Sequence, residues 1–149
     1  MSSESIETEE SLELSSGVSA FEAKHFSQAM RLLTPLAEKG NADAQYRIGI
    51  MYQNGLGVVR DEANALQSMQ NAAEQGHALA QHGLGFMYME GDCVGQDGVE
   101  AVKWFRKAAE KGLIGSQTTL AMMYEEGRGI EKDPDEARKW YQRAGFEYK

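Results

Sequence analysis

The chain has 149 residues, of which 42% are hydrophobic, and a formal net charge of −8. This length is typical of one domain, and the acidic balance argues against a nucleic-acid-binding protein, because such proteins need a basic face. The single cysteine, Cys93, cannot form an internal disulfide, and no apolar run is long enough to span a membrane. We therefore expect a cytoplasmic globular protein without a signal peptide.

The N-terminal segment is acidic. Residues 1–20 contain five acidic side chains and no Lys or Arg. A segment with few apolar residues and a high net charge buries too little apolar surface to offset the entropy lost on folding. We therefore expect residues 1–8 to form a disordered tail, and the folded part of the chain to begin at about residue 9.

The rest of the chain repeats with a period of 36 residues. A period of this size is typical of repeat proteins that are built from helix pairs. The period relates many sets of three identical residues: Gly40, Gly76 and Gly112; Gln45, Gln81 and Gln117; Met51, Met87 and Met123; Tyr52, Tyr88 and Tyr124; Asp61, Asp97 and Asp133; Ala65, Ala101 and Ala137.

Each of these repeats contains two helical patterns. Apolar residues recur on one helix face over residues 44–52 and again over residues 65–73. Gly55 follows the first pattern at the place of a left-handed C-cap, and Gly76 ends the second pattern. Asp61 precedes the second pattern at the N-cap position, where a carboxylate accepts hydrogen bonds from unpaired backbone amides. The same features recur in the later repeats, with Asp97 and Asp133 as the N-caps.

The loop between the two helices suggests two kinds of ligand site in the last repeat. Gly127 and Gly129 are followed by four acidic residues within 131–136. A phosphate-binding loop is excluded because no lysine follows the glycines at the required spacing. A calcium loop is excluded because Arg138 stands where that motif needs glycine. We therefore predict that the glycines turn the chain and that the acids begin the next helix.

Cys93 interrupts this loop pattern in the middle repeat. It replaces the glycine that is found at Gly57 and Gly129. If this position requires a positive φ, the second loop must take another route, for which Gly95 offers the freedom. No base or cation lies beside Cys93 in sequence, so we expect a packed or merely exposed thiol.

These motifs resemble the tetratricopeptide repeat, and more closely its Sel-1-like variant. The segments GLGVVRDEANA (55–65) and GRGIEKDPDEA (127–137) resemble the long loop of the variant, and AAEQG (72–76) and AAEKG (108–112) are further marks of it. The resemblance implies an all-α, right-handed α-solenoid of helix-turn-helix repeats. We expect a single solenoid over residues 9–149, with units of about 9–39, 40–75, 76–111 and 112–145, because such repeats bury their apolar faces by stacking.

The resemblance also implies a partner-binding groove on the first helices of the repeats. Ile50, Phe86 and Met122 would form an apolar ridge in this groove, although the same pattern fits the core between repeats, and both alternatives stay open. Trp104 and Trp140, on the second helices, are predicted to be core residues. The groove residues that the resemblance implies are Asp43, Tyr46, Ile50, Asn54, Leu79, His82, Phe86, Met89, Glu90, Met122, Glu125 and Glu126.

The sequence contains no catalytic or metal-binding motif. His77 and His82 are five residues apart, so they do not share a helix face as a zinc-binding pair does, and one cysteine cannot form a thiolate cluster. No serine begins a Ser-x-x-Lys signature of the penicillin-recognising enzymes. We therefore expect no metal, no cofactor and no enzyme activity.

The resemblance implies a non-catalytic adaptor or scaffold, in a bacterial setting, that binds a partner protein or peptide. One alternative is a β-lactamase-like hydrolase, as associated with cysteine-rich relatives, and another is an immunity or regulatory protein that neutralises one effector. We expect no nucleic-acid or membrane partner. The apolar C-terminal tail, with Phe146 and Tyr148, either folds back over the last helix or allows self-association through the C-terminal repeat.

Overall fold

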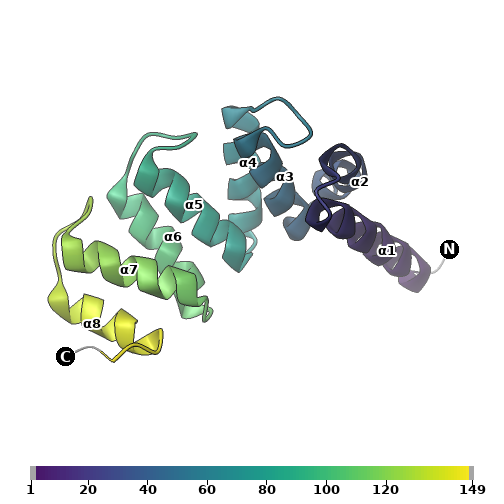
Figure 1. Cartoon of the computed structure of the whole chain (residues 1–149). Helices are drawn as coiled ribbons and strands as arrows, with labels where there is room; N and C mark the ends of the chain where they lie inside the picture. The colour runs from purple at the N-terminus through teal and green to yellow at the C-terminus, as the bar shows by residue number, and fades with distance from the viewer. Residues whose placement is uncertain (1–2, 148–149) are drawn as a thin grey trace. The chain divides into compact units, whose positions relative to one another are not determined.

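The computed structural model describes residues 3–147, and the side chains of residues 9–147. Within residues 3–147 the chain forms eight helices and no strand (Figure 1). The prediction of an all-α repeat fold is therefore confirmed. The helices are α1 (Ser3–Glu22), α2 (Phe26–Glu38), α3 (Ala42–Asn54), α4 (Glu62–Glu74), α5 (Ala78–Glu90), α6 (Gly98–Glu110), α7 (Ile114–Glu126) and α8 (Pro134–Arg143).

The structure describes the predicted tail over residues 1–8 only in part. Residues 1–2 are not described, and nothing is described of the side chains of residues 3–8. The helix α1 is assigned from Ser3. The disordered tail stays a prediction.

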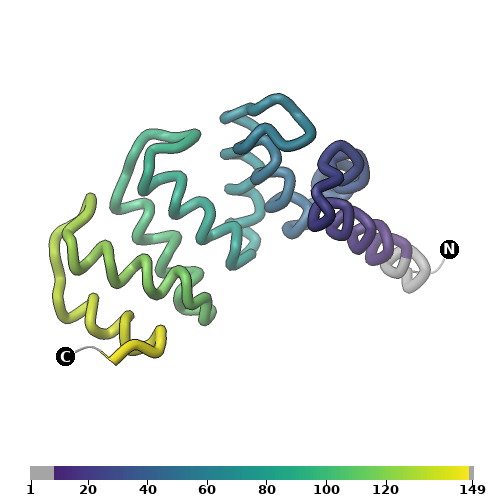
Figure 2. Tube along the Cα trace, in the orientation of Figure 1, coloured from purple at the N-terminus to yellow at the C-terminus, as the bar shows by residue number. Residues whose placement is uncertain are grey.

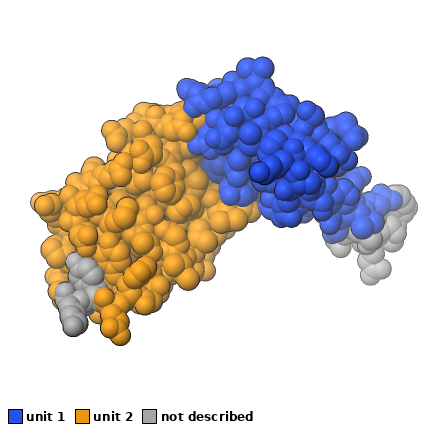
Figure 3. All heavy atoms as spheres, in the orientation of Figure 1, with its two compact units in different colours: residues 1–75 blue, residues 76–149 orange. Residues whose placement is uncertain are grey.

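The chain divides into two compact units, residues 1–75 and residues 76–149 (Figure 3). Unit 1 contains α1 to α4 and unit 2 contains α5 to α8, so each holds two helix pairs. The helices of each pair pack against each other, and α2 packs against α3 as α6 does against α7. A single continuous solenoid over residues 9–149 stays a prediction. No helix among residues 3–147 has the length and apolar character of a membrane span.

The second helices of the long-loop repeats begin at the predicted aspartates. The Asp61 carboxylate accepts a hydrogen bond from the Asn64 amide, and Asp97 and Asp133 do the same for the amides three residues later, at 3.1 Å in each case. The first helices end at Gly55, Gly91 and Gly127, each in the left-handed conformation. These caps confirm the helix boundaries that the repeat pattern predicts, because they satisfy backbone groups that a helix end leaves unpaired.

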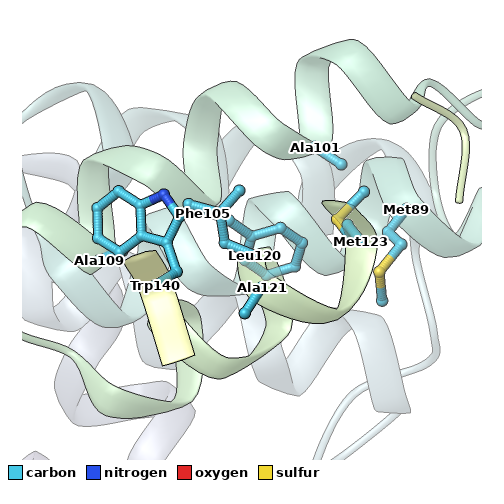
Figure 4. Packing of buried hydrophobic residues seen from close by; sticks show 8 residues of the cluster. All are labelled: Met89, Ala101, Phe105, Ala109, Leu120, Ala121, Met123 and Trp140. Carbon is cyan, nitrogen blue, oxygen red and sulfur yellow. The ribbon is translucent and has the colours of Figure 1, made fainter. Parts of the chain in front are cut away.

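Each unit has its own buried core. In unit 2 the tryptophan of α8, Trp140, is fully buried, and Trp104 is only 6% exposed, which confirms both as core residues. The core of unit 2 comprises Met89, Ala101, Phe105, Ala109, Leu120, Ala121, Met123 and Trp140 (Figure 4). The core of unit 1 comprises Ala20, Ala29, Leu33, Leu36, Ala44, Ile48 and Met51.

Long loops join the two helices of the last three pairs (Figure 2), and Cys93 lies in the middle one. The expected detour through Gly95 is wrong. Cys93 itself adopts a φ of 66°, close to the 71° and 72° of Gly57 and Gly129, so the backbone is left-handed at this position in all three loops. A cysteine in this conformation is strained by its Cβ atom, whereas a glycine adopts it without that strain.

The C-terminal tail folds back on the last helix. The Phe146 amide donates a hydrogen bond to the Tyr141 carbonyl at 3.0 Å, and the two rings meet edge to face at 6.0 Å. Of the two alternatives for the tail, the structure therefore has the folded-back one for residues up to 147. Phe146 remains 53% exposed in this position.

Candidate functional site

The predicted groove residues of unit 1 lie on α3. The Asp43 carboxylate and the Arg47 guanidinium form an ion pair at 3.2 Å, one helical turn apart. Tyr46 is half-buried, and burial is the main cause that raises the pKa of its hydroxyl; Arg47 lowers this pKa and Asp43 raises it. The Asn54 side chain donates to the Ile50 carbonyl at 2.9 Å, and Ile50 is itself half-buried. This part of the site is polar at both ends of a partly apolar helix face.

The predicted residues of α5 separate into exposed and buried members. Leu79 is 45% exposed and Phe86 is 38% exposed, and Glu90 is also exposed. Met89 is only 4% exposed and belongs to the core of unit 2. Met89 therefore packs within the protein rather than on a binding surface. Its neighbour in sequence, Glu90, points outward because the two lie on different faces of the helix.

Three aromatic rings of unit 2 form a compact cluster, which we call the aromatic trio: His82, Phe86 and Phe105. The His82 ring meets the Phe86 ring at 4.9 Å and the Phe105 ring at 5.3 Å, and the two phenylalanines meet at 5.4 Å. All three contacts are edge to face, the arrangement that aromatic quadrupoles favour. Phe105 is fully buried, so the trio connects the exposed Phe86 directly to the core.

A hydrogen bond connects α5 to α7 at this cluster. His82 Nδ1 lies 2.6 Å from the Ser116 hydroxyl oxygen. Burial lowers the pKa of the His82 imidazole, because the interior disfavours its charged form. A Cβ atom at Gly115 would lie 3.7 Å from the same ring, so α7 approaches His82 closely here. His82 of α5 thus lies next to the start of α7.

The remaining predicted residues lie on α7, towards its C-terminal end. Met122 is half-buried, and Glu125 and Glu126 are exposed. Glu90 of α5 forms an ion pair with Arg128, at 2.9 Å, in the loop that follows α7. We call the predicted groove residues of unit 2 other than the buried Met89 the first-helix face: Leu79, His82, Phe86, Glu90, Met122, Glu125 and Glu126.

A serine hydrogen-bonded to a histidine raises the question of nucleophilic catalysis. Ser116 is 0% exposed, so its hydroxyl has no access to a substrate in this structure. In the described part of the chain, no carboxylate hydrogen-bonds to His82 to orient it, as a triad requires. Among the same residues no group of three or more His, Cys, Asp or Glu side chains could hold a metal ion. The His82–Ser116 contact joins α5 to α7.

Sequence reasoning missed three contributors to this site: Ser116, Phe105 and Arg128. For Ser116 a signal was available, because the 36-residue period aligns it with Ala44 and Ala80, and a hydroxyl replaces a methyl there. For Arg128 no signal was available, since its partner Glu90 lies 38 residues earlier.

The paired helices and their period define an all-α repeat protein of the solenoid class. The chain belongs to the Sel1 repeat family, as predicted, because the model of the Sel1 repeat matches residues 42–77, 78–113 and 115–145. The helix pair α1–α2 precedes the first of these matches. No match was found among curated proteins.

Solved structures of Sel1 repeat proteins are similar to this chain. A Sel1 repeat protein from Oxalobacter formigenes is 39% identical, with a TM-score of 0.82, over 89% of this chain and 53% of its own length. The protein c5321, a protective antigen of uropathogenic Escherichia coli strains with an SLR fold, is 41% identical, with a TM-score of 0.75, over 77% of this chain and 25% of its own. The chain thus spans about half of the first protein and a quarter of the second.

A third solved structure supports the fold alone. Helicobacter pylori cysteine rich protein B is 18% identical, with a TM-score of 0.63, over 83% of this chain and 90% of its own length. The chain described here has a single cysteine, Cys93, so the two share the helix-pair architecture without the cysteine content. Sel1 repeat proteins are generally protein-interaction modules.

Proposed function

We propose that this protein is a non-catalytic interaction module, an adaptor or scaffold, that binds a partner protein or peptide on its first helices. The observation that carries the proposal is the first-helix face of unit 2. Leu79 and Phe86 are exposed there, although most large apolar side chains of the unit are buried. Exposed apolar groups rimmed by polar ones are typical of a protein interaction site.

The chemistry of this face favours a particular kind of partner. Phe86 offers an aromatic surface that the trio holds in place, so little side-chain entropy is lost on binding. Glu125 and Glu126, which the proposal includes in this face, are exposed and would add negative charge. This arrangement suits a peptide in which one apolar residue contacts Phe86 and Leu79 and a nearby Lys or Arg faces the glutamates. The apolar contact would then contribute most of the binding energy. An immunity or regulatory protein would use the same face to hold its effector.

The proposal is tested with peptides selected from a random phage-displayed library on the full chain. Binding of a selected peptide is then measured by calorimetry for the wild type and for Leu79→Asp and Phe86→Asp. We expect each substitution to weaken binding at least tenfold, about 1.4 kcal/mol, while Val99→Asp, at a 70% exposed position on α6, leaves it unchanged. Circular dichroism checks that each variant is folded.

Two results would refute this proposal. One is a folded Leu79→Asp variant that binds every selected peptide as the wild type does. The other is a set of peptides whose binding depends on Val99 rather than on Leu79 or Phe86. Self-association through the C-terminal repeat is a separate prediction, and light scattering across a concentration series tests it.

A further inference from the structure

An open pocket lies in unit 1 between α2, α3 and α4. It has a volume of about 250 Å³, and Ile48 and Tyr52 of α3 and Ser68 of α4 are among the residues that line it. Ile48 also belongs to the buried core of unit 1, so the floor of the pocket is apolar. This pocket is distinct from the first-helix face, which belongs to unit 2.

Ser68 stands where both later repeats have a tryptophan. The 36-residue period places Ser68 in register with Trp104 and Trp140. In unit 2 the Trp140 side chain, from α8, fills the space against α6 and α7 and is fully buried (Figure 4). The helices α2, α3 and α4 of unit 1 correspond by register to α6, α7 and α8 of unit 2.

The floor of the open pocket matches the surroundings of the Trp140 indole. Ala37 and Ile48 line the pocket. Their counterparts two periods later, Ala109 and Leu120, lie in the buried cluster that contains Trp140. The pocket in unit 1 is therefore the space that an indole ring fills in unit 2. A serine is too small to fill it, and the space stays open to solvent.

The mouth of the pocket lacks the two arginine side chains that lie beside the Trp140 ring in unit 2. In unit 2 the Arg143 and Arg106 guanidinium groups lie 4.5 Å and 5.8 Å from the centre of the Trp140 ring. Asn71 and Thr34 occupy the corresponding positions at the pocket. Because these two side chains are short and neutral, no long cationic side chain covers the opening at these positions, and a ring can enter from solvent.

A hydrogen-bond acceptor for an indole is also retained. In unit 2 the Trp140 ring N–H donates to Glu136 Oε2 at 3.2 Å. Asn64 occupies the position that corresponds to Glu136 and lines the pocket. Its amide nitrogen donates to Asp61 Oδ2 at 2.8 Å, so its carbonyl oxygen remains the acceptor for an incoming N–H.

We propose that this pocket binds an indole ring, which packs on Ala37 and Ile48 and donates its N–H to the Asn64 carbonyl oxygen. Two sources share this chemistry: a small indole compound, and a tryptophan side chain of a partner polypeptide. The arrangement reproduces a packing that the same chain already uses for Trp140. The proposal does not depend on the first-helix face, and either one can fail alone.

The experiment uses the ¹⁵N-labelled full chain, titrated in separate series with indole and with N-acetyl-L-tryptophanamide. We expect saturable shifts of the amide resonances of the pocket residues, with a dissociation constant of about 1 mM for a ligand of this size. Ser68→Trp fills the pocket, so it abolishes these shifts and raises Tm by about 3 °C. Ala63→Trp, at an exposed position on the same helix, leaves the binding unchanged.

A second variant keeps the proposal testable if Ser68→Trp does not fold. Asn64→Leu removes the acceptor, so it weakens indole binding about fivefold and leaves binding of benzofuran, which has no N–H, unchanged. In the titrations of the wild type, binding of both indole and N-acetyl-L-tryptophanamide supports a site for a tryptophan side chain. Binding of indole but not of N-acetyl-L-tryptophanamide supports a small-molecule site. The proposal is overturned if neither indole nor N-acetyl-L-tryptophanamide shifts the amide resonances of the pocket residues at about 10 mM. It is also overturned if a folded Ser68→Trp variant binds these two compounds as the wild type does.

Discussion

Replacing Gly57 by alanine tests whether the long loop is held by a close backbone approach. Gly57 has a φ of 71°, and a Cβ atom there would lie 2.6 Å from the Phe26 carbonyl carbon and 2.8 Å from the Ser27 nitrogen. Both atoms belong to the backbone at the start of α2, so no side-chain rotation relieves the overlap. The loop or the helix must move instead.

The cost of this substitution has two parts. The left-handed conformation destabilises a residue with a Cβ atom by roughly 1–2 kcal/mol. The lower conformational entropy of the unfolded alanine variant offsets about 0.5–1 kcal/mol of this. Overpacking adds roughly 1–3 kcal/mol. We therefore expect Gly57→Ala to lower the free energy of unfolding by roughly 1–4.5 kcal/mol in total.

Gly40→Ala is the matched control, because it separates the two parts. Gly40 also has a positive φ, 97°, but a Cβ atom there meets no other atom within 4 Å. We expect it to cost about 1 kcal/mol, from conformation alone. Urea unfolding followed by circular dichroism measures both variants, since both tryptophans, Trp104 and Trp140, lie in unit 2 and report only on that unit. Equal losses for Gly57→Ala and Gly40→Ala would refute the close-approach argument.

Two further predictions concern unit 2. Cys93→Gly removes a Cβ atom from a residue with a φ of 66° and should raise the free energy of unfolding by up to about 1 kcal/mol; a loss of stability in urea would show that packing of the thiol matters more than the backbone strain. Burial lowers the pKa of His82 in the folded state below its ordinary value of 6.5, so the unfolded chain binds the proton more readily. The free energy of unfolding therefore decreases as the pH falls through 6.5, until the pH is below the lowered pKa of the folded state. His82→Gln should reduce this loss of stability, measured as Tm in thermal melts between pH 7 and pH 5. An unchanged dependence of Tm on pH would contradict its attribution to His82.

The partly exposed Phe86 of the aromatic trio and the open pocket at Ser68 are two features that differ between the repeats. Phe86, which the 36-residue period aligns with Ile50 and Met122, is 38% exposed while its ring contacts the buried Phe105. At Ser68 a ring that later repeats supply is missing. Both departures leave the helix pair intact, because caps and the small alanines of the core set the backbone packing.

The caps and the core register were predictable from sequence. Asp61, Asp97 and Asp133 cap the second helices as expected, and Trp140 is buried as expected. These features follow from local rules, since a cap depends on the three residues after it and a helix stripe depends on spacing. The route of the Cys93 loop was not predictable, because the strain of one residue had to be compared with the packing of the whole loop.

The sequence by itself determined the period, the helix pairs and the family, because every repeat needs the same residue types at the same caps and packing positions. Only the tertiary structure decided which side chains of those repeats are available to another molecule. Met89 is buried and Phe86 is exposed although both were predicted for the groove. His82 contacts Ser116, 34 residues away, and the pocket at Ser68 needs three helices to form. Such features depend on residues brought together from different helices, and no spacing within one helix encodes them.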